Sequence, residues 1–167
     1  MKISRGDRET VETERDRKAI ENRQRAVRLA RRPLESFLRR VQEELGIPSA
    51  GVTVCLVSDA EIARLNETFR KKKGPTDVLS FPMLMMRKPV RLRPGAPTVK
   101  AGEYLGDIAI SPATARRYAK KNGRKLSSEL RVLILHGVLH LLGYDHETDR
   151  GEMDRVERKL RKRLGLA

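Results

Sequence analysis

The segment HGVLHLLGYDH, residues 136–146, contains all three histidines of this 167-residue chain. It ends an apolar stretch, about residues 127–142, whose hydrophobic spacing predicts a helix. His136 and His140 are four residues apart, so a helix places both imidazoles on one face at neighbouring turns. Gly143 suits the left-handed conformation that ends helices, and the chain can then turn to bring His146 towards the other two. The segment therefore predicts a central helix with a metal site at its end.

The three imidazoles indicate which kind of metal site this is. Three neutral protein ligands leave the fourth position of a tetrahedral ion open, as in catalytic rather than structural zinc sites. Imidazole also binds nickel, copper and iron, but zinc suits the set best. The alternative, that the histidines are polar members of a buried helix face, explains one isolated histidine better than three. We expect one Zn²⁺ ion on His136, His140 and His146, with Asp145 either hydrogen-bonded to a ligand imidazole or capping the helix end.

The histidine spacing also matches the metzincin protease pattern, with one difference. Metzincins place a glutamate after the first histidine as general base, and this chain has Gly137 there. Glycine cannot move a proton, so a protease would lack its main catalytic group. Peptide hydrolysis is therefore the less favoured function.

Outward from this segment, the chain predicts one α+β domain of strands and helices. β-branched apolar runs predict strands, and apolar residues at helical spacing predict helices. The expected strands are a short edge strand within residues 20–27, and residues 51–57, 78–81 and 105–110. The expected helices are residues 33–45, 58–69, 112–122, 127–142 and 149–164.

Local signals mark where some of these elements begin. Pro33 is tolerated at the first helical position, and Ser58 with Glu61 forms a capping-box pattern. Asp149 with Glu152 is expected to cap the final helix in the same way. Residues 83–102 contain prolines and glycines and predict a long loop, which in compact domains often borders a site.

The charge of the chain favours a polyanionic partner. Lys and Arg number 37 against 22 Asp and Glu, giving a formal net charge of +15. Nucleic acid is the leading candidate, although charge alone does not separate RNA from DNA or from an anionic membrane. Few aromatics and no tryptophan argue against an extended base-stacking platform. An RNA-backbone track or an ordinary solvated helix face would explain the cluster of Arg116, Arg117, Lys120, Lys121, Arg124 and Lys125.

The cysteine content, the length of the apolar runs and the charged first residues indicate the compartment and the domain organisation. A single cysteine, Cys55, excludes an intrachain disulfide and is expected to be a buried strand thiol in a reducing compartment. No run approaches the roughly 20 apolar residues that span a bilayer, so we expect a cytoplasmic protein without membrane attachment. Residues 1–17 are nearly all charged or polar and predict a disordered extension, followed by one domain over residues 18–167.

Three stretches together resemble the YbeY family of bacterial rRNA-maturation endoribonucleases: LNETFRKKKGPTDVLSFP (65–82), LGDIAIS (105–111) and HGVLHLLGYDH (136–146). The resemblance runs from about Ile20 to the C-terminus and includes Met153 and Glu157. It implies an α+β fold with a mixed, mainly four-stranded sheet between helices, and a zinc ion on the three histidines. It also implies single-strand-specific RNA cleavage in maturation of the 16S rRNA 3′ end and in late ribosome quality control. The implied partners are ribosomal RNA and the ribosome, and no organic cofactor is implied.

The family pattern also assigns a role to one arginine. In its N-x-x-F/Y-R segment the arginine lies in the cleft near the metal and is important for activity, and that position is Arg70 here. A planar guanidinium gives bidentate contact to phosphate oxygens. The alternative is that Arg70 is a solvated member of the basic run 70–73. Asp77 and Asp107 either orient a ligand or hold the sheet edge, and we expect the structural role first.

These residues predict a mechanism with one part missing. A metal ion would act as a Lewis acid and Arg70 would stabilise charge on the phosphate oxygens. The general base has no assigned residue, and the nucleophile is either a water or the ribose 2′-hydroxyl. A non-catalytic ribosome-assembly factor with a structural zinc is the serious alternative, ahead of a metalloprotease-like hydrolase. The sequence does not decide the oligomeric state.

Overall fold

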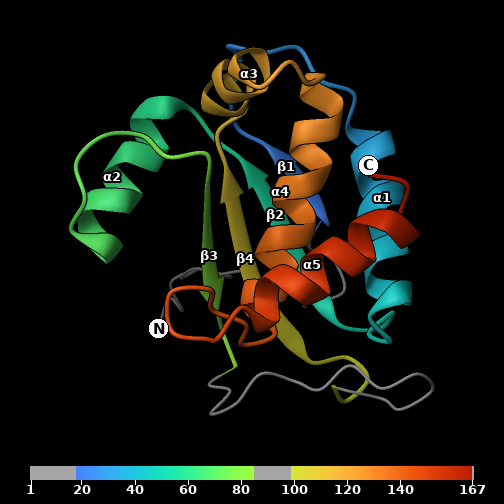
Figure 1. The fold of residues 1–167 in the computed structure, drawn as a ribbon. Coiled ribbons are helices and arrows are strands. Elements are labelled where there is room, and N and C mark those ends of the chain that lie inside the picture. Colours follow the sequence, from blue (N-terminus) through green and yellow to red (C-terminus); the bar gives the residue numbers. More distant parts are fainter. Residues whose placement is uncertain (1–17, 85–98, 167) are drawn as a thin grey trace, which may run out of the picture.

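The computed structural model describes residues 18–84 and 99–166 and has an α+β fold around a four-stranded mixed sheet (Figure 1). The strand order is β1-β2-β4-β3, with β1, β2 and β4 parallel and β3 antiparallel to β4. The strands are β1 (Ile20–Asn22), β2 (Gly51–Leu56), β3 (Val78–Pro82) and β4 (Tyr104–Ile110). The helices are α1 (Arg31–Glu44), α2 (Asp59–Arg70), α3 (Pro112–Lys121), α4 (Leu126–Leu141) and α5 (Glu152–Arg163).

Helices cover both faces of the sheet, as the resemblance implied. Alternate residues of β4 point to opposite faces, so Ile108 and Ile110 enter the main core while Ala109 joins a smaller cluster. The main core contains buried residues from α1, α4 and α5, and α4 lies across β3 and β4 (Figure 1). On the other face, Ile62 of α2 packs with Leu79 and Ala109. The central helix is therefore α4, and its C-terminal end carries the histidines.

Close packing of α4 on β4 explains the glycine inside the histidine segment. A Cβ atom added to Gly137 would lie 2.7 Å from Cγ2 of Ile108, which is fully buried. Gly137 therefore faces the sheet, and the hydroxyl of Ser80 on β3 donates a hydrogen bond to its carbonyl at 3.3 Å. At the position where metzincins have their catalytic glutamate, Gly137 allows α4 to pack closely against β4, which leaves no room for a side chain.

The short strand expected within residues 20–27 is β1, which spans Ile20–Asn22. After the end of β1, the side chain of Gln24 forms the hydrogen bonds that a neighbouring strand would otherwise form. Its Nε2 donates to the Val27 carbonyl at 2.9 Å, and its Oε1 accepts from the Val27 amide at 2.9 Å. A buried amide side chain thus closes a turn directly after the short strand. The edge position of β1 is confirmed.

Two helix starts also differ from the expectation. The first helix begins at Arg31, so Pro33 occupies its first turn rather than its first position, where its missing N–H is still not required. The last helix begins at Glu152 after Gly151, three residues later than expected. Asp149 nevertheless supplies its carboxylate, which accepts from the amides of Gly151 at 2.8 Å and Met153 at 2.7 Å. The cap is therefore an acidic side chain in the preceding loop.

The expected extension, residues 1–17, and most of the expected loop at residues 83–102 lie outside the described residues. Within the described part, no helix is both long and apolar enough to cross a membrane.

Candidate metal centre

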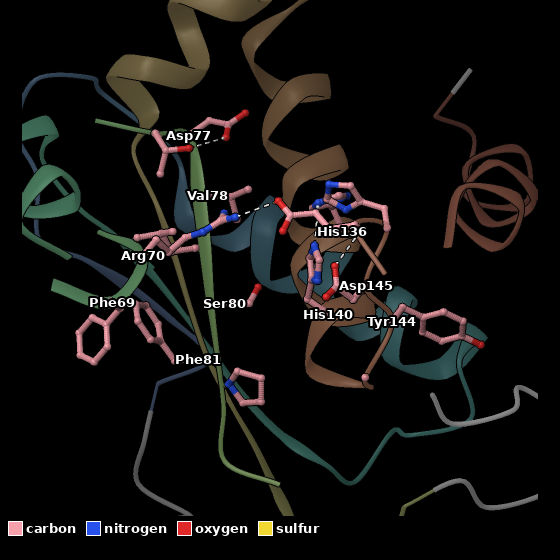
Figure 2. Close-up of a pocket in the computed structure, with 16 residues that line it drawn as sticks. Phe69, Arg70, Asp77, Val78, Ser80, Phe81, His136, His140, Tyr144 and Asp145 are labelled. Carbon is pink, nitrogen blue, oxygen red and sulfur yellow. Dashed lines mark hydrogen bonds and ion pairs between the residues drawn. The ribbon is translucent and has the colours of Figure 1, made fainter. Parts of the chain in front are cut away.

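A cleft of about 700 Å³ lies beside β3, between the end of α2 and the end of α4 (Figure 2). The loop after α4 closes one side of it, and the segment after α2 closes the other. The lining residues are Phe69, Arg70, Thr76 to Pro82, His136, His140 and Gly143 to Glu147. The cleft therefore brings together two of the sequence stretches that carried the family resemblance.

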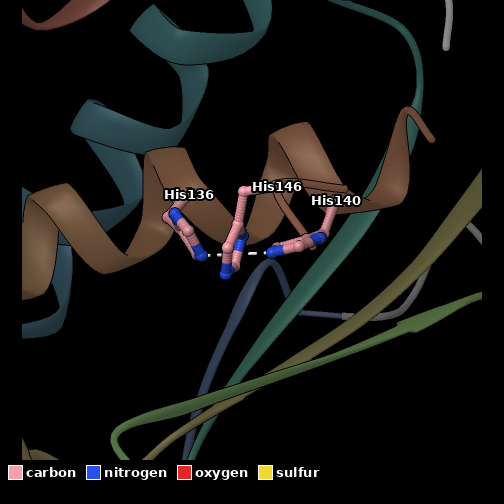
Figure 3. Close-up of side chains that lie close together, drawn as sticks. All are labelled: His136, His140 and His146. Atoms are coloured by element: carbon pink, nitrogen blue, oxygen red, sulfur yellow. Dashed lines mark hydrogen bonds between the residues drawn. The ribbon is translucent and has the colours of Figure 1, made fainter. Parts of the chain in front are cut away.

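All three histidines converge in this cleft (Figure 3). Their candidate ligand nitrogens lie within 4.8 Å of one another, and the Nε2 atoms of His136 and His140 are 3.1 Å apart. Gly143 has a φ of 91°, the left-handed conformation expected for it, and the chain turns there to bring His146 to the same point. His136 and His140 are half-buried, whereas His146 is exposed. The predicted cluster is therefore present as a geometric unit.

The donor set fits a transition-metal ion. Ligand nitrogens about 2.0–2.1 Å from a tetrahedral zinc lie roughly 3.3 Å apart, close to the spacing of His136 and His140. Burial, together with the neighbouring His136 and His146, lowers the pKa of His140 to about 4. His140 is therefore neutral near pH 7, which keeps a lone pair for a metal.

Glu157 of α5 contacts the imidazole of His136 on its Nδ1 side. Its Oε2 lies 2.9 Å from Nδ1 of His136, and its Oε1 accepts from Arg161 at 2.8 Å. Burial alone would raise the pKa of Glu157, but the hydrogen bonds and charges of His136 and Arg161 outweigh it and lower that pKa. The carboxylate can only accept, so Nδ1 carries the hydrogen and Nε2 keeps its lone pair for an ion.

The sequence alone predicts no role for Glu157. The available signal was a charged residue on the apolar face of α5, between the buried Met153 and Leu160. A buried carboxylate requires a partner, and His136 and Arg161 supply it. The signal does not name the partner, because His136 lies 21 residues away in the sequence.

Arg70 lies at the end of α2 and lines the cleft opposite the histidine loop (Figure 2). Its guanidinium forms an exposed ion pair with Glu147, the residue after His146, at 3.2 Å. The buried Asn66 shapes this end of the helix, because its side-chain amide donates to the Gly74 carbonyl at 3.0 Å. Lys71 then adopts a φ of 53° and ends the helix. Arg70 therefore lines the cleft, and its role in activity stays a prediction.

The three aspartates considered in the sequence have different surroundings. Asp145 lines the cleft, and its Oδ1 accepts from the Glu147 amide at 3.0 Å. A hydrogen bond from Asp145 to a ligand imidazole remains a prediction. Asp77 lines the cleft and its carbonyl accepts from the Ser111 amide at 2.9 Å, holding β3 to the end of β4. Asp107 accepts from the Tyr104 hydroxyl and does not line the cleft.

Some of the basic residues on and after α3 form ion pairs and hydrogen bonds within the fold. Arg117 pairs with Asp59 at 2.9 Å and donates to the Thr114 hydroxyl at 2.8 Å. Arg124 lies 3.5 Å from Glu129. None of the six basic residues lines the cleft, so an RNA track on this helix would be separate from the histidines.

Comparisons with known proteins agree with one another. The family model described as endoribonuclease YbeY matches residues 11–165, which includes part of the segment expected to be an extension. The chain is 44% identical to endoribonuclease YbeY of Solibacter usitatus over 143 residues, 85% of each chain. It is 37% identical to endoribonuclease YbeY of Aquifex aeolicus over 153 residues, 90% of this chain and 91% of that protein. A solution structure of a Thermotoga maritima protein has a TM-score of 0.54 at 27% identity, covering 87% of this chain and 88% of that one.

Proposed function

This chain belongs to the YbeY endoribonuclease family, and on that premise we propose that it is a metal-dependent endoribonuclease. The proposed ion is one Zn²⁺ held by His136, His140 and His146. The observation that carries the proposal is the convergence of three imidazoles in an open cleft that Arg70 also lines. A purely structural zinc ion is normally coordinated by four protein ligands. Among the residues that the structure describes, the cluster here has only three.

The chain's own residues account for binding and orientation of a phosphodiester. Arg70 would contact the phosphate oxygens through its planar guanidinium and offset the charge that develops on them. Glu157 would keep His136 in the tautomer whose Nε2 faces the cleft. When bound, the ion supplies Lewis-acid polarisation of the phosphate.

The residue that accepts the proton is not at position 137, where metzincins have their glutamate. Gly137 faces β4, and an added Cβ would collide with Ile108. The product ends identify the nucleophile, because attack by the ribose 2′-hydroxyl leaves a cyclic phosphate and attack by water leaves a linear one. The same packing makes a protease function the least favoured alternative.

We extend the proposal to the biological substrate on the strength of the family. Single-stranded ribosomal RNA, cut during maturation of the 16S rRNA 3′ end and in late ribosome quality control, is the proposed substrate. The formal net charge of +15 supports a polyanionic partner. The ribosome is the proposed site of action, in the cytoplasm, with no organic cofactor.

The experiment measures RNA cleavage and folding in parallel on purified protein. A catalytic ion predicts that a chelator stops cleavage of a labelled single-stranded rRNA precursor, and that Zn²⁺ restores it, while circular dichroism stays native. The rival, a ribosome-assembly factor with a structural ion, predicts that the chelator unfolds the protein and that the metal-loaded protein leaves the RNA intact. Metal analysis of the untreated protein identifies the ion.

A further inference from the structure

Two phenylalanines lie side by side in the cleft, although they come from different elements. Phe69 is at the end of α2 and Phe81 is in β3. Their ring centroids are 5.1 Å apart and their planes meet at 74°, an edge-to-face arrangement (Figure 2). The chain has only three phenylalanines, and two of them lie together in this cleft.

The exposure of Phe69 is what requires an explanation. Its exposed fraction is 64%, and the other exposed large hydrophobic residues in the described part of the chain are Met83 and Tyr118. Of these three, only Phe69 lines the cleft. A purely structural role would be to cap the small apolar cluster around Ile62 and Leu79. Phe81 already packs against that cluster, while most of the Phe69 ring remains in solvent.

The neighbour of Phe69 points to the ligand chemistry. Phe69 and Arg70 are consecutive, with Cα atoms about 3.8 Å apart, and both line the cleft. A nucleotide likewise joins a flat ring to an anionic phosphate. Aromatic side chains bind single-stranded RNA by stacking on its bases, and guanidinium groups bind its phosphates.

We propose that Phe69, held in place by Phe81, stacks on one unpaired nucleobase of the substrate while Arg70 binds a neighbouring phosphate. The proposal rests on the endoribonuclease function above and gives it a physical source of single-strand selectivity. A base inside a duplex is covered on both faces and cannot reach the ring unless it is unpaired and unstacked. One exposed ring provides for one base, which agrees with the small number of aromatics in the chain.

The test compares RNA binding by variants that separate the aromatic ring from its apolar bulk. Phe69→Leu keeps an apolar side chain against Phe81 but removes the stacking surface, and Phe69→Trp restores one. Tyr118→Leu, on α3 and outside the cleft, removes an exposed ring elsewhere as the matched control. Binding is measured by fluorescence anisotropy in a His140→Ala background, which keeps the RNA intact, with a single-stranded oligomer and a duplex of the same sequence.

The expected result is a loss of single-strand affinity of about fivefold or more for Phe69→Leu, since stacking on one base is worth that much. Phe69→Trp and Tyr118→Leu keep the parent affinity, and duplex binding does not change. Placing 2-aminopurine at successive RNA positions should give one position whose fluorescence is quenched by the parent protein and not by Phe69→Leu.

Unchanged single-strand affinity in Phe69→Leu, or an equal loss for duplex and single strand, would overturn the stacking role. Thermal unfolding of each variant shows whether the fold is intact, and a Phe69→Leu loss that Phe69→Trp does not rescue also counts against stacking. Failure of the proposed function appears differently: the unsubstituted protein would not cut RNA at all. The binding comparison would still decide the role of Phe69 in that case.

Discussion

Glu157 and His136 are joined by a hydrogen bond of 2.9 Å that connects the final helix to the metal centre. The contact is largely buried and involves a carboxylate that also pairs with Arg161. Carboxylates in this position fix the tautomer of a ligand imidazole and increase its basicity. The last helix is therefore part of the site as well as part of the core.

Glu157→Gln is expected to weaken metal affinity, because the amide removes the negative charge behind His136. Loss of such a partner typically costs about 10- to 100-fold in affinity. Competition with a chromophoric chelator measures it. Asp154→Asn, an exposed acidic residue on the same helix, removes the same charge and should leave the affinity nearly unchanged. Equal effects of the two substitutions would mean that only the overall charge matters.

Glu147→Gln is expected to strengthen RNA binding, because Glu147 competes with phosphate for Arg70. Exposed ion pairs are worth about 0.2–1 kcal/mol, so the dissociation constant should fall by roughly 1.4- to 5-fold at low salt. Glu44→Gln is the matched control, since Glu44 pairs with Arg163 and not with a residue of the cleft. Weaker binding by Glu147→Gln than by Glu44→Gln would contradict the competition.

Gly137→Ala is expected to lower the free energy of unfolding, because the new Cβ would overlap the buried Ile108. Overpacking typically costs about 1–3 kcal/mol, and the better helix propensity of alanine returns up to about 1 kcal/mol. Urea denaturation measures the net change. Adding Ile108→Val should recover part of the loss, and a double-mutant cycle without any coupling would refute the steric explanation.

Cys55 is expected to react slowly with alkylating reagents in the folded protein. Cys55 lies in β2 and is only partly buried rather than fully buried as expected, and this burial raises the pKa of its thiol to about 11. A shift of two pH units reduces the thiolate fraction by about 100-fold, and the thiolate is the reactive form. Iodoacetamide labelling at pH 8 should therefore be much slower in native than in urea-unfolded protein. Because the folded pKa is raised, stability should also fall as the pH rises from about 9 towards 11. Equal labelling rates in the two states would contradict this.

The part of the site that depends on local sequence could be predicted. The spacing of His136 and His140 on one helix, and the turn at Gly143, are consequences of backbone geometry over a few residues. The positions of the strands and helices along the chain follow similarly from apolar periodicity, and the largest error lies at the start of the last helix, where the Asp149 side chain accepts from backbone amides. The arrangement of the strands in a mixed sheet was expected from the family resemblance.

The parts that depend on packing between distant segments could not be predicted from pattern alone. The partner of Arg70 lies 77 residues further along the chain, at Glu147. The contact of Gly137 with Ile108 depends on how closely α4 approaches β4. Family resemblance placed Arg70 in the cleft, but neither the ion pair nor the aromatic neighbours of Arg70 could be read from the motif.

If the three-histidine cluster and Arg70 act together in RNA cleavage, removal of either should stop it. Purified wild-type protein, His140→Ala and Arg70→Ala are compared for cleavage of the same single-stranded rRNA precursor. Arg39→Ala, an exposed arginine of α1, is the control for loss of one positive charge. Wild type and Arg39→Ala are expected to cut the RNA, whereas both site variants lose cleavage and Arg70→Ala still binds metal. Cleavage that survives both site substitutions would show that neither the histidine cluster nor Arg70 is needed for it.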